Sequence, residues 1–382
     1  MSRKLDVDAL IDDPRTRIIV CCGSGGVGKT TTAAALGLRA ADRGRDVVVL
    51  TVDPARRLAQ SMGLSELDNS PRKIDGVVGT GELHAMMLDM KRTFDEIIEA
   101  HSDPDRAKQI LANPFYQSLS SSFSGTQEYM AMEKLGQLHR SDAWDLIIVD
   151  TPPSRNALDF LDAPERMGRF LDGRFIKLLF APAKAGGKLG LKVVSVGFGM
   201  FTSVITKVLG GQLLKDVSTF VTAFDTVFGG FRERAEKTYQ LLQTPGTAFL
   251  VVAAPEPDAL REASYFVERL ASERMPLAGL VVNRMAQSGA ASLSAARSQA
   301  AAETLEERGD EHMLTARLLR LHAERMQLAA RQGRLRDHFS AAHPTVPVAA
   351  VPAQAEDVHD LDGLRRVGED LSVQPVSAIK TA

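Results

Sequence analysis

The sequence predicts an α/β fold in which a doubly wound, mostly parallel sheet carries an inserted helical subdomain. Two observations predict it. Short runs of β-branched and other apolar residues end abruptly at glycine, proline or aspartate, and helix-forming stretches lie between these runs. Strands that are apolar throughout belong to parallel sheets covered on both faces, and their alternation with helices is typical of doubly wound folds.

Seven such runs are predicted to be strands: residues 17–22, 46–53, 84–89, 145–150, 248–255, 278–283 and 345–352. Four helices are predicted between them, at residues 30–45, 90–111, 127–140 and 258–273. Residues 295–339 are rich in charge and carry Leu and Met at helical spacing. This pattern predicts a long amphipathic helix, or a pair of helices, packed on the protein.

The chain is predicted to divide into a core and two helical parts. Residues 113–140 are predicted to be a helical insertion and residues 161–242 a helical subdomain, since both are rich in Met, Phe, Leu and Gly and lack a strand-like run. The other predicted parts, in chain order, are core residues 1–112, core residues 141–160, core residues 243–370 with the long helical segment, and a loose tail at residues 371–382.

The composition excludes several classes of protein. The 46 basic and 48 acidic residues of the 382-residue chain leave a formal charge of −2, which does not indicate a nucleic-acid partner. The two cysteines, Cys21 and Cys22, are adjacent and are expected to be small buried hydrophobes rather than zinc ligands or a disulfide. The amino-terminus has no apolar core of a signal peptide, and residues 193–206 are shorter than the ~20 residues of a membrane span. We therefore predict a cytoplasmic protein that is not integral to a membrane.

A glycine-dense loop follows the first predicted strand. Its sequence, GSGGVGKTT, matches the pattern G-x-x-x-x-G-K-S/T, with a strand before it and a helix-forming run after it. Glycines let successive backbone N–H groups point at phosphate oxygens, and the following helix adds its positive end. We expect Lys29 to bridge the β- and γ-phosphates of ATP and the Thr30 hydroxyl to bind Mg²⁺. The predicted nucleotide-binding residues are Gly23, Ser24, Gly25, Gly26, Val27, Gly28, Lys29, Thr30 and Thr31.

Two aspartates end predicted strands, at the edge of the sheet where ligands bind in such folds. Asp150 follows the run LIIV and is predicted to hold Mg²⁺ through the water shell of the ion, while the Thr30 hydroxyl binds it. Asp53 is predicted to orient or deprotonate the attacking water, and it is also a candidate magnesium ligand. With Lys29 it makes up the predicted catalytic pair. The alternative interpretation is that each aspartate only caps the helix that follows it.

Three motifs, GGVGKTT, VDPARRL and DTPPSRNALDFL, resemble those of the ArsA-type ATPases, which include the arsenite-pump ATPase and relatives that deliver tail-anchored proteins to membranes. The resemblance implies that Asp53 is the switch I aspartate for hydrolysis and that residues 150–154 open switch II. It also implies that Asn283, at the end of GLVVN, reads adenine, although an asparagine at a strand end can equally form a turn. The family's members work as dimers, so a homodimer or a heterodimer with a related ATPase is implied.

One residue departs from the family pattern at a position that matters for catalysis. The family usually reads GKGGVGKT, where the first lysine reaches the phosphates of the partner subunit, and here that position is Ser24. Three explanations stay open: a heterodimer with a relative that keeps the lysine, a homodimer in which Arg56, Arg57 or Arg155 substitutes, or slow hydrolysis with ATP as a conformational ligand. The cysteines for arsenite and the Cys-x-x-Cys zinc pair of the family are absent, so neither arsenite transport nor a zinc-bound dimer is predicted.

The helical subdomain contains a candidate surface for a client protein. Residues 189–211 are apolar, rich in glycine and include Met200, as a groove for varied hydrophobic helices would be. The alternative is ordinary interior packing. The predicted function is a Mg²⁺-dependent dimeric ATPase that couples its nucleotide state to the helical subdomain. The competing prediction is an ATP-binding regulatory subunit with poor catalysis that acts through a relative carrying the lysine.

Overall fold

The computed structural model describes most of the chain and divides it into two compact units. The first unit comprises Met1–Met87, Leu138–Leu158 and Leu241–Ala382, and the second comprises Leu88–Gln137 and Asp159–Gln240. The residues described within them are 3–52, 57–64, 66–113, 116–117, 127–152 and 233–372. Within these ranges, no helix has both the length and the apolar character needed to cross a membrane.

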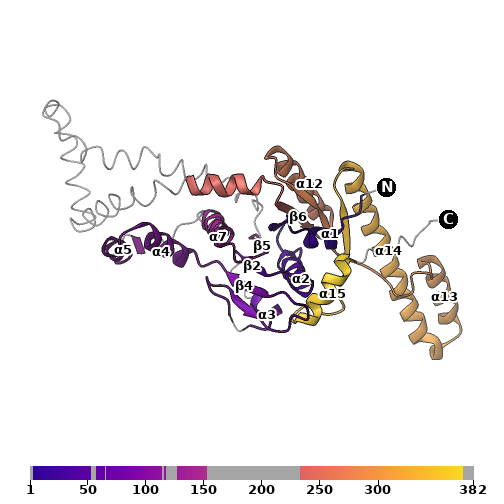
Figure 1. The fold of residues 1–382 in the computed structure, drawn as a ribbon. Coiled ribbons are helices and arrows are strands. Elements are labelled where there is room, and N and C mark those ends of the chain that lie inside the picture. The colour runs from indigo at the N-terminus through magenta and orange to yellow at the C-terminus, as the bar shows by residue number, and fades with distance from the viewer. Residues whose placement is uncertain are drawn as a thin grey trace, which may run out of the picture. The chain divides into compact units, whose positions relative to one another are not determined.

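An eight-stranded sheet forms the centre of the first unit, in the order β3-β4-β2-β5-β1-β6-β7-β8 (Figure 1). Neighbouring strands are parallel except β3 and β4. The strands are β1 (Ile18–Cys22), β2 (Val47–Thr51), β3 (Arg72–Ile74), β4 (Leu83–Met87), β5 (Leu146–Asp150), β6 (Thr247–Ala253), β7 (Leu277–Met285) and β8 (Val348–Pro352). Strand β1 lies in the middle of the sheet, between β5 and β6. The strand order reverses there, so the carboxyl end of β1 is at a topological switch point, where ligands bind in such folds. The predicted doubly wound, mostly parallel α/β fold is confirmed.

The central strands are buried on both faces, as their continuous apolar sequences predict. Every residue of β1, β2 and β5 is buried. The helices are α1 (Val7–Asp12), α2 (Lys29–Asp42), α3 (Arg57–Ser61), α4 (Met90–His101), α5 (Pro104–Leu111), α7 (Gln127–Ser141), α12 (Pro257–Ser272), α13 (Ala295–Glu307), α14 (Met313–Ala342) and α15 (Leu361–Ser372).

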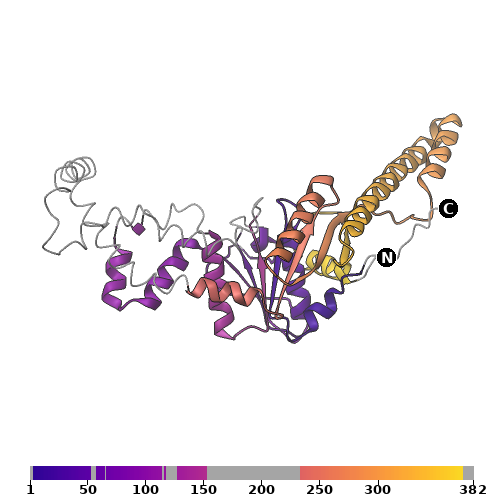
Figure 2. The same cartoon turned by 90° about the horizontal axis from the view of Figure 1, so that it is seen from above.

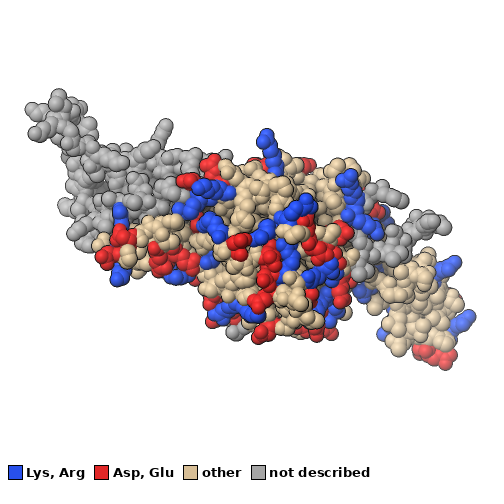
Figure 3. Space-filling model, viewed as in Figure 1, with Lys and Arg blue, Asp and Glu red and all other residues tan. Residues whose placement is uncertain are grey.

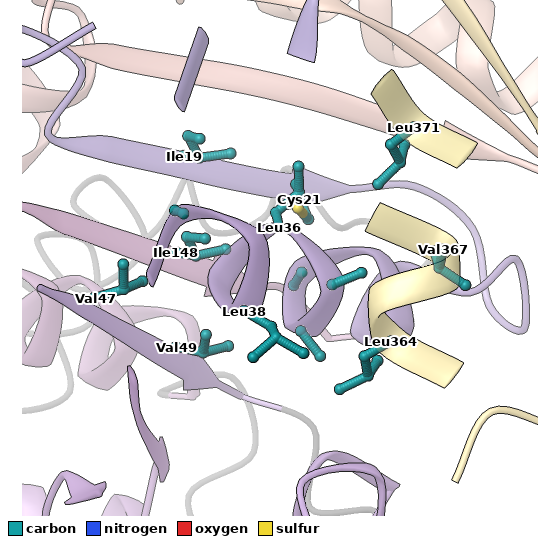
Figure 4. Packing of buried hydrophobic residues seen from close by; sticks show 14 of the residues in the cluster. Ile19, Cys21, Leu36, Leu38, Val47, Val49, Ile148, Leu364, Val367 and Leu371 are labelled. Carbon is teal, nitrogen blue, oxygen red and sulfur yellow. The ribbon is translucent and has the colours of Figure 1, made fainter. Parts of the chain in front are cut away.

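Helices α2 and α15 cover one face of the sheet, where the largest apolar cluster lies (Figure 4). Strand residues such as Ile19, Val49 and Ile148 belong to this cluster together with Leu36 of α2, and α15 adds the residues Leu364, Val367 and Leu371. Cys21 and Cys22 are both buried in β1, which confirms the expected role as small hydrophobes. Burial raises the pKa of the Cys22 thiol to about 12, so that sulfur stays protonated and inert.

Three local features refine the sequence-based expectations: one predicted helix is divided, one open alternative is decided and one strand is added. The predicted helix over residues 90–111 is two helices, because Pro104 cannot continue α4 and Asp103 caps α5 by accepting a hydrogen bond from the Arg106 N–H at 3.0 Å. The segment at residues 295–339 is the helical pair rather than one helix, with Gly309 at φ 118° between α13 and α14. Strand β3 was not predicted, since three residues with one buried side chain carry no clear strand pattern.

The second compact unit begins at Leu88, earlier than the predicted boundary at residue 113. Helix α4 belongs to it because α4 and α7 are joined there: the Lys134 ammonium of α7 donates to Glu96 of α4 at 2.9 Å. The hydroxyl of Tyr116, which is buried, donates to Asp95 at 2.6 Å. These contacts connect residues that are distant in sequence, so local sequence patterns could not predict them.

Helix α1 is held to α2 by an ion pair whose contribution can be measured. The Asp8 carboxylate accepts hydrogen bonds from Arg39 Nε at 2.6 Å and from its terminal nitrogen at 2.7 Å, and these bonds lower the pKa of Asp8. We expect Asp8→Asn to reduce the free energy of unfolding by about 1 kcal/mol at pH 7. Because the folded pKa lies below the unfolded value of about 3.9, this stabilisation is present above that pH and is lost as pH falls through the folded pKa.

Urea unfolding of wild type and Asp8→Asn at pH 7, and again below pH 3.9, checks this expectation. Asp12→Asn is the matched control, because Asp12 and its partner Arg43 are more exposed, at 44% and 37%, than Asp8 and Arg39, at 30% and 19%. The control is expected to lose less stability. Equal losses in the two variants, or a loss for Asp8→Asn that does not shrink in acid, would contradict the assignment.

Candidate functional site

A tight loop connects β1 to α2, and its backbone conformation demands glycine. Gly23 has φ 149°, and a Cβ there would lie 2.1 Å from the carbonyl oxygen of Val252 in β6. Gly28 has φ 94°, and a Cβ there would lie 2.3 Å from Nδ2 of Asn283. Both positions therefore require glycine on two grounds, the left-handed backbone and the space. The loop passes close against β6 and β7, which hold its shape.

The beginning of α2 supplies positive charge to this loop. Gly28 is the N-cap and has no side chain, so the N–H groups of the first turn stay available to an anion. Lys29, the first residue of α2, is almost completely buried, and its Nζ donates to the backbone oxygen of Ser24 at 2.8 Å. The ammonium is thus held across the loop, where it adds to the positive end of the helix. A phosphate group is the ligand that this arrangement suits.

A buried carboxylate lies beside the helix start. Asp150, the last residue of β5, is fully buried, and its Oδ2 accepts hydrogen bonds from the Thr30 hydroxyl at 2.7 Å and from the Thr51 hydroxyl at 2.9 Å. A hydroxyl and a carboxylate oxygen so close together are the kind of ligands that Mg²⁺ takes from a protein when phosphates and water complete its shell. The residues present therefore fit a magnesium ion held by Thr30 and Asp150.

Thr51 is a site residue that the sequence analysis missed. It ends β2 directly opposite Asp150 in the parallel register, which is why its hydroxyl reaches the carboxylate. Its place at the end of a buried strand, two residues before Asp53, was the available signal. Threonine in a strand is so common that this signal alone has little weight.

The end of β7 holds two successive carbonyl groups of the loop. Asn283 is buried, and its Nδ2 donates to the oxygen of Val27 at 2.9 Å. Arg284, the next residue, donates from its guanidinium to the oxygen of Gly26 at 3.0 Å. In a trans peptide the N–H points opposite to the C=O. Because the carbonyls of Gly26 and Val27 point toward β7, the N–H groups of Val27 and Gly28 point away from it. We call Asn283 and Arg284 the loop clamp.

Arg284 was also missed by the sequence analysis. Its backbone is in the left-handed region, with φ 61°, which is uncommon and costly for a residue that has a side chain. The N–H of Arg284 donates to Oδ1 of Asn283 at 3.0 Å, so the two residues of the clamp also support each other. The Asn283 amide keeps one N–H and one lone pair in addition to these two bonds. The predicted contact of Asn283 with adenine is compatible with the clamp and stays a prediction.

Some of the predicted residues lie outside the described ranges. They are Asp53, Arg56, Arg155 and the candidate client segment at residues 189–211, together with the side chain of Arg57. Of the remaining predicted residues, Lys29, Thr30, Asp150 and Asn283 meet at the loop through the hydrogen bonds above. Thr151, which follows Asp150, donates from its hydroxyl to the oxygen of Cys21 at 2.9 Å and so ties the ends of β5 and β1 together.

The chain was compared with known families and proteins. Residues 16–311 match the model of the anion-transporting ATPase family, ArsA ATPase. An ATPase GET3 of Podospora anserina is 25% identical over 287 residues, which cover 73% of this chain and 76% of the relative. One of Ajellomyces dermatitidis is 27% identical over 282 residues, or 72% and 75% of the two chains. One of Malassezia globosa is 31% identical over 162 residues, or 42% and 46%.

The family match includes the loop, the two candidate magnesium ligands Thr30 and Asp150, and the loop clamp, and it agrees with the three motifs that resemble the ArsA-type ATPases. The phosphate-binding geometry between β1 and α2 and the relatives named as ATPases point to the same activity. This chain belongs to the ArsA family of anion-transporting ATPases and is an ATPase.

Proposed function

We propose that this protein is a magnesium-dependent, dimeric switch ATPase of the cytoplasm, which couples its nucleotide state to its helical subdomain. The observation that carries the proposal is the hydrogen bond between the Thr30 hydroxyl and Asp150 at 2.7 Å, next to the ammonium of Lys29 on the loop. One side of the site thus offers oxygen ligands to a cation and the other offers donors to phosphate. ATP with Mg²⁺ needs both.

Each described residue has a defined task in this proposal. The loop N–H groups and the start of α2 bind the phosphates, and Lys29 neutralises charge on the γ-phosphate that is transferred. Thr30 and Asp150 would hold Mg²⁺, which when bound neutralises charge on the β- and γ-phosphates. Thr51 orients the Asp150 carboxylate through its hydrogen bond. Asp53 is assigned to orient the attacking water, by resemblance to the family.

The coupling is proposed to run along the end of β5. Asp150, which is bonded to Thr30, is a proposed magnesium ligand, and the hydroxyl of Thr151, the next residue, donates to the oxygen of Cys21 in β1. A change at the γ-phosphate that shifts Asp150 would therefore pull on the segment that continues toward the helical subdomain. A hydrophobic protein segment is the proposed client, on the basis of the apolar residues 189–211 and the resemblance to ATPases that deliver tail-anchored proteins.

Direct titration tests the proposal. The purified full chain is expected to bind ATP and ADP in the presence of Mg²⁺, as measured by calorimetry, and to release phosphate in a steady-state assay. Omitting Mg²⁺ is expected to weaken ATP binding and to stop release. If the folded chain with ample Mg²⁺ took up neither nucleotide, the proposed function would be wrong.

A regulatory subunit is the second candidate, and Ser24 is the observation that favours it. Serine cannot supply the cation that the family's lysine brings to the partner's phosphates, and losing such a cation can cost ~10³ or more in rate. A regulatory subunit would bind ATP tightly and release little phosphate alone. Phosphate release measured with and without a relative that carries the lysine separates the two candidates.

The loop clamp has its own test. We expect Arg284→Gly to lower the affinity for ATP roughly 10-fold, because it removes a charge-assisted hydrogen bond that holds the loop while it relieves the left-handed backbone. Arg274→Gly is the matched control, since Arg274 is also in the left-handed region, with φ 56°, and lies at the end of α12. Calorimetric titration of ATP into both variants checks this. Unchanged affinity in Arg284→Gly, or the same loss in the control, would show that the clamp does not shape the site.

A further inference from the structure

The left-handed turn at Arg284 is held by hydrogen bonds on both of its sides. On the amino-terminal side, the Arg284 N–H donates to Oδ1 of Asn283 at 3.0 Å. On the carboxyl-terminal side, the oxygen of Met285 accepts a hydrogen bond at 2.9 Å from the N–H of Ala353, the residue that follows β8. A left-handed backbone is costly for a residue that has a side chain, so it persists only where the surroundings fix it.

A third hydrogen bond comes from a side chain of another element. The Ala286 N–H, two residues after Arg284, donates to Oε1 of Gln332 in α14 at 2.7 Å. Both residues are half-buried, so water competes less for this bond than it would at an open surface. The bond spans 46 positions of sequence. It fixes the direction in which the chain leaves the turn.

A histidine of the same helix fastens the segment that follows. A carbonyl oxygen only accepts hydrogen bonds, so His322 of α14 donates from Nε2 to the oxygen of Leu293, at 2.8 Å. The Nδ1 of His322 is hydrogen-bonded to the Ser288 hydroxyl at 2.9 Å. The segment from residue 286 to residue 293 is thus fastened to α14 near both of its ends. The end of β7 therefore has a fixed position relative to this helix.

Gln332 belongs to the part of α14 that is anchored to the sheet. Helix α14 packs against α12 and β7, and its carboxyl end leads into β8. Its amino-terminal part projects from the sheet together with α13 (Figure 2) and exposes Leu314, Leu318 and Leu321. Figure 3 shows mainly residues that are neither acidic nor basic over the visible face of this helical pair. The support that Gln332 gives to the turn thus comes from the anchored half of the helix.

We propose that Gln332 is a positioning residue for ATP binding. By holding the Ala286 N–H, it keeps Arg284 in the left-handed turn, and so keeps the loop clamp on the phosphate loop. Without this bond the backbone at Arg284 relaxes toward ordinary strand angles, which turns the guanidinium away from the oxygen of Gly26. The loop N–H groups that bind phosphate then lose their fixed direction. The inference deepens the proposed function and rests on it, since the loop must be the phosphate site.

Two substitutions at this position test the role of the accepting oxygen. Gln332→Met removes that oxygen but keeps the length of the side chain and its helix propensity. We expect it to weaken ATP binding about five-fold, measured by calorimetry on the full chain with Mg²⁺. Gln332→Glu keeps an accepting oxygen and is expected to bind ATP within about two-fold of wild type. Partial unfolding would instead lower the number of binding sites and leave the affinity unchanged.

Gln327, which is exposed on the same helix, supplies the matched controls. Gln327→Met and Gln327→Glu repeat the loss of an amide and the gain of a charge on α14, away from the hydrogen bond with Ala286. Neither is expected to change the affinity for ATP. An equal loss in Gln332→Met and Gln327→Met, or a Gln332→Glu variant that binds ATP as weakly as Gln332→Met, would overturn the proposal.

A double-mutant cycle tests whether Gln332 acts through Arg284. Arg284→Gly already releases the oxygen of Gly26, and glycine adopts the left-handed turn without support. In that background, Gln332→Met is expected to weaken ATP binding by less than about two-fold more. If the two losses multiplied in full, Gln332 would act by another route and the proposal would be wrong.

Amide hydrogen exchange of the full chain without nucleotide separates this inference from the proposed function. A peptide from residues 23–31 is expected to exchange faster in Gln332→Met than in wild type or Gln332→Glu, while a peptide from β4 exchanges at the same rate in all three. Faster exchange of the loop in a chain that binds no ATP would contradict the proposed function and support the positioning role. Unchanged exchange together with wild-type affinity for ATP in Gln332→Met would overturn the positioning role and leave the proposed function standing.

Discussion

Lys29→Ala is expected to reduce the affinity for ATP by about 100-fold and turnover by ~10³ or more. The reason is the position of the ammonium, which is buried at the start of α2 and bonded to the loop oxygen of Ser24 at 2.8 Å. Alanine leaves the helix start in place but removes the only side-chain cation of the described loop residues 23–31. Calorimetric binding and phosphate release measure the two effects.

The stability of the Lys29→Ala variant must be measured beside its activity, because a buried side chain is removed. Thermal unfolding without nucleotide provides that check, and Lys73→Ala serves as the control. Lys73 lies on β3 and is 55% exposed, so its removal should change neither ATP affinity nor turnover. A folded Lys29→Ala protein that binds ATP like wild type would refute the assignment of the loop as the phosphate site.

Asp53→Asn is expected to lower turnover by roughly 10²–10⁴-fold and to leave ATP affinity within about a factor of two. Asparagine keeps the size of the side chain but cannot accept the proton of the attacking water. Steady-state phosphate release and equilibrium binding, measured on the same preparation, separate the two quantities. This separation matters because a magnesium ligand would affect both.

Asp42→Asn is the control for Asp53→Asn. Asp42 ends α2 and pairs with Arg365 at 3.2 Å, so its loss should affect stability and not turnover. Equal turnover in wild type and Asp53→Asn would remove Asp53 from the mechanism. A parallel loss of ATP binding in Asp53→Asn would instead assign Asp53 to the magnesium site.

Much of the core could be predicted because its signals are local. A run such as LIIVD is apolar throughout and ends in a charged residue, so it predicts both a buried strand and a polar group at its carboxyl end. The glycine pattern before Lys29 is equally local, because the left-handed backbone angles at Gly26 and Gly28 favour glycine whatever packs against the loop. Strand and loop were therefore predicted together, and with them the family.

The loop clamp and the Thr51 contact could not be predicted in this way. Arg284 reaches Gly26 across 258 positions of sequence, and Thr51 reaches Asp150 across 99. Neither residue type announces such a contact, because arginine is usually at the surface and threonine usually fills a strand. The roles of Arg284 and Thr51 follow from the strand order. It places β7 one strand away from β1, which the loop follows, and it places β2 beside β5.

The sequence by itself determined the class of fold, the phosphate loop and the type of ligand, since each depends on which conformations a short segment can adopt and which charges it carries. Tertiary structure alone decided which side chains complete the site and which side of α14 remains uncovered. A leucine repeat is the same in a sequence whether its side chains are buried or exposed. Only the folded structure shows that Ala316 and Met326 of α14 are buried while Leu314 and Leu321 of the same helix are exposed.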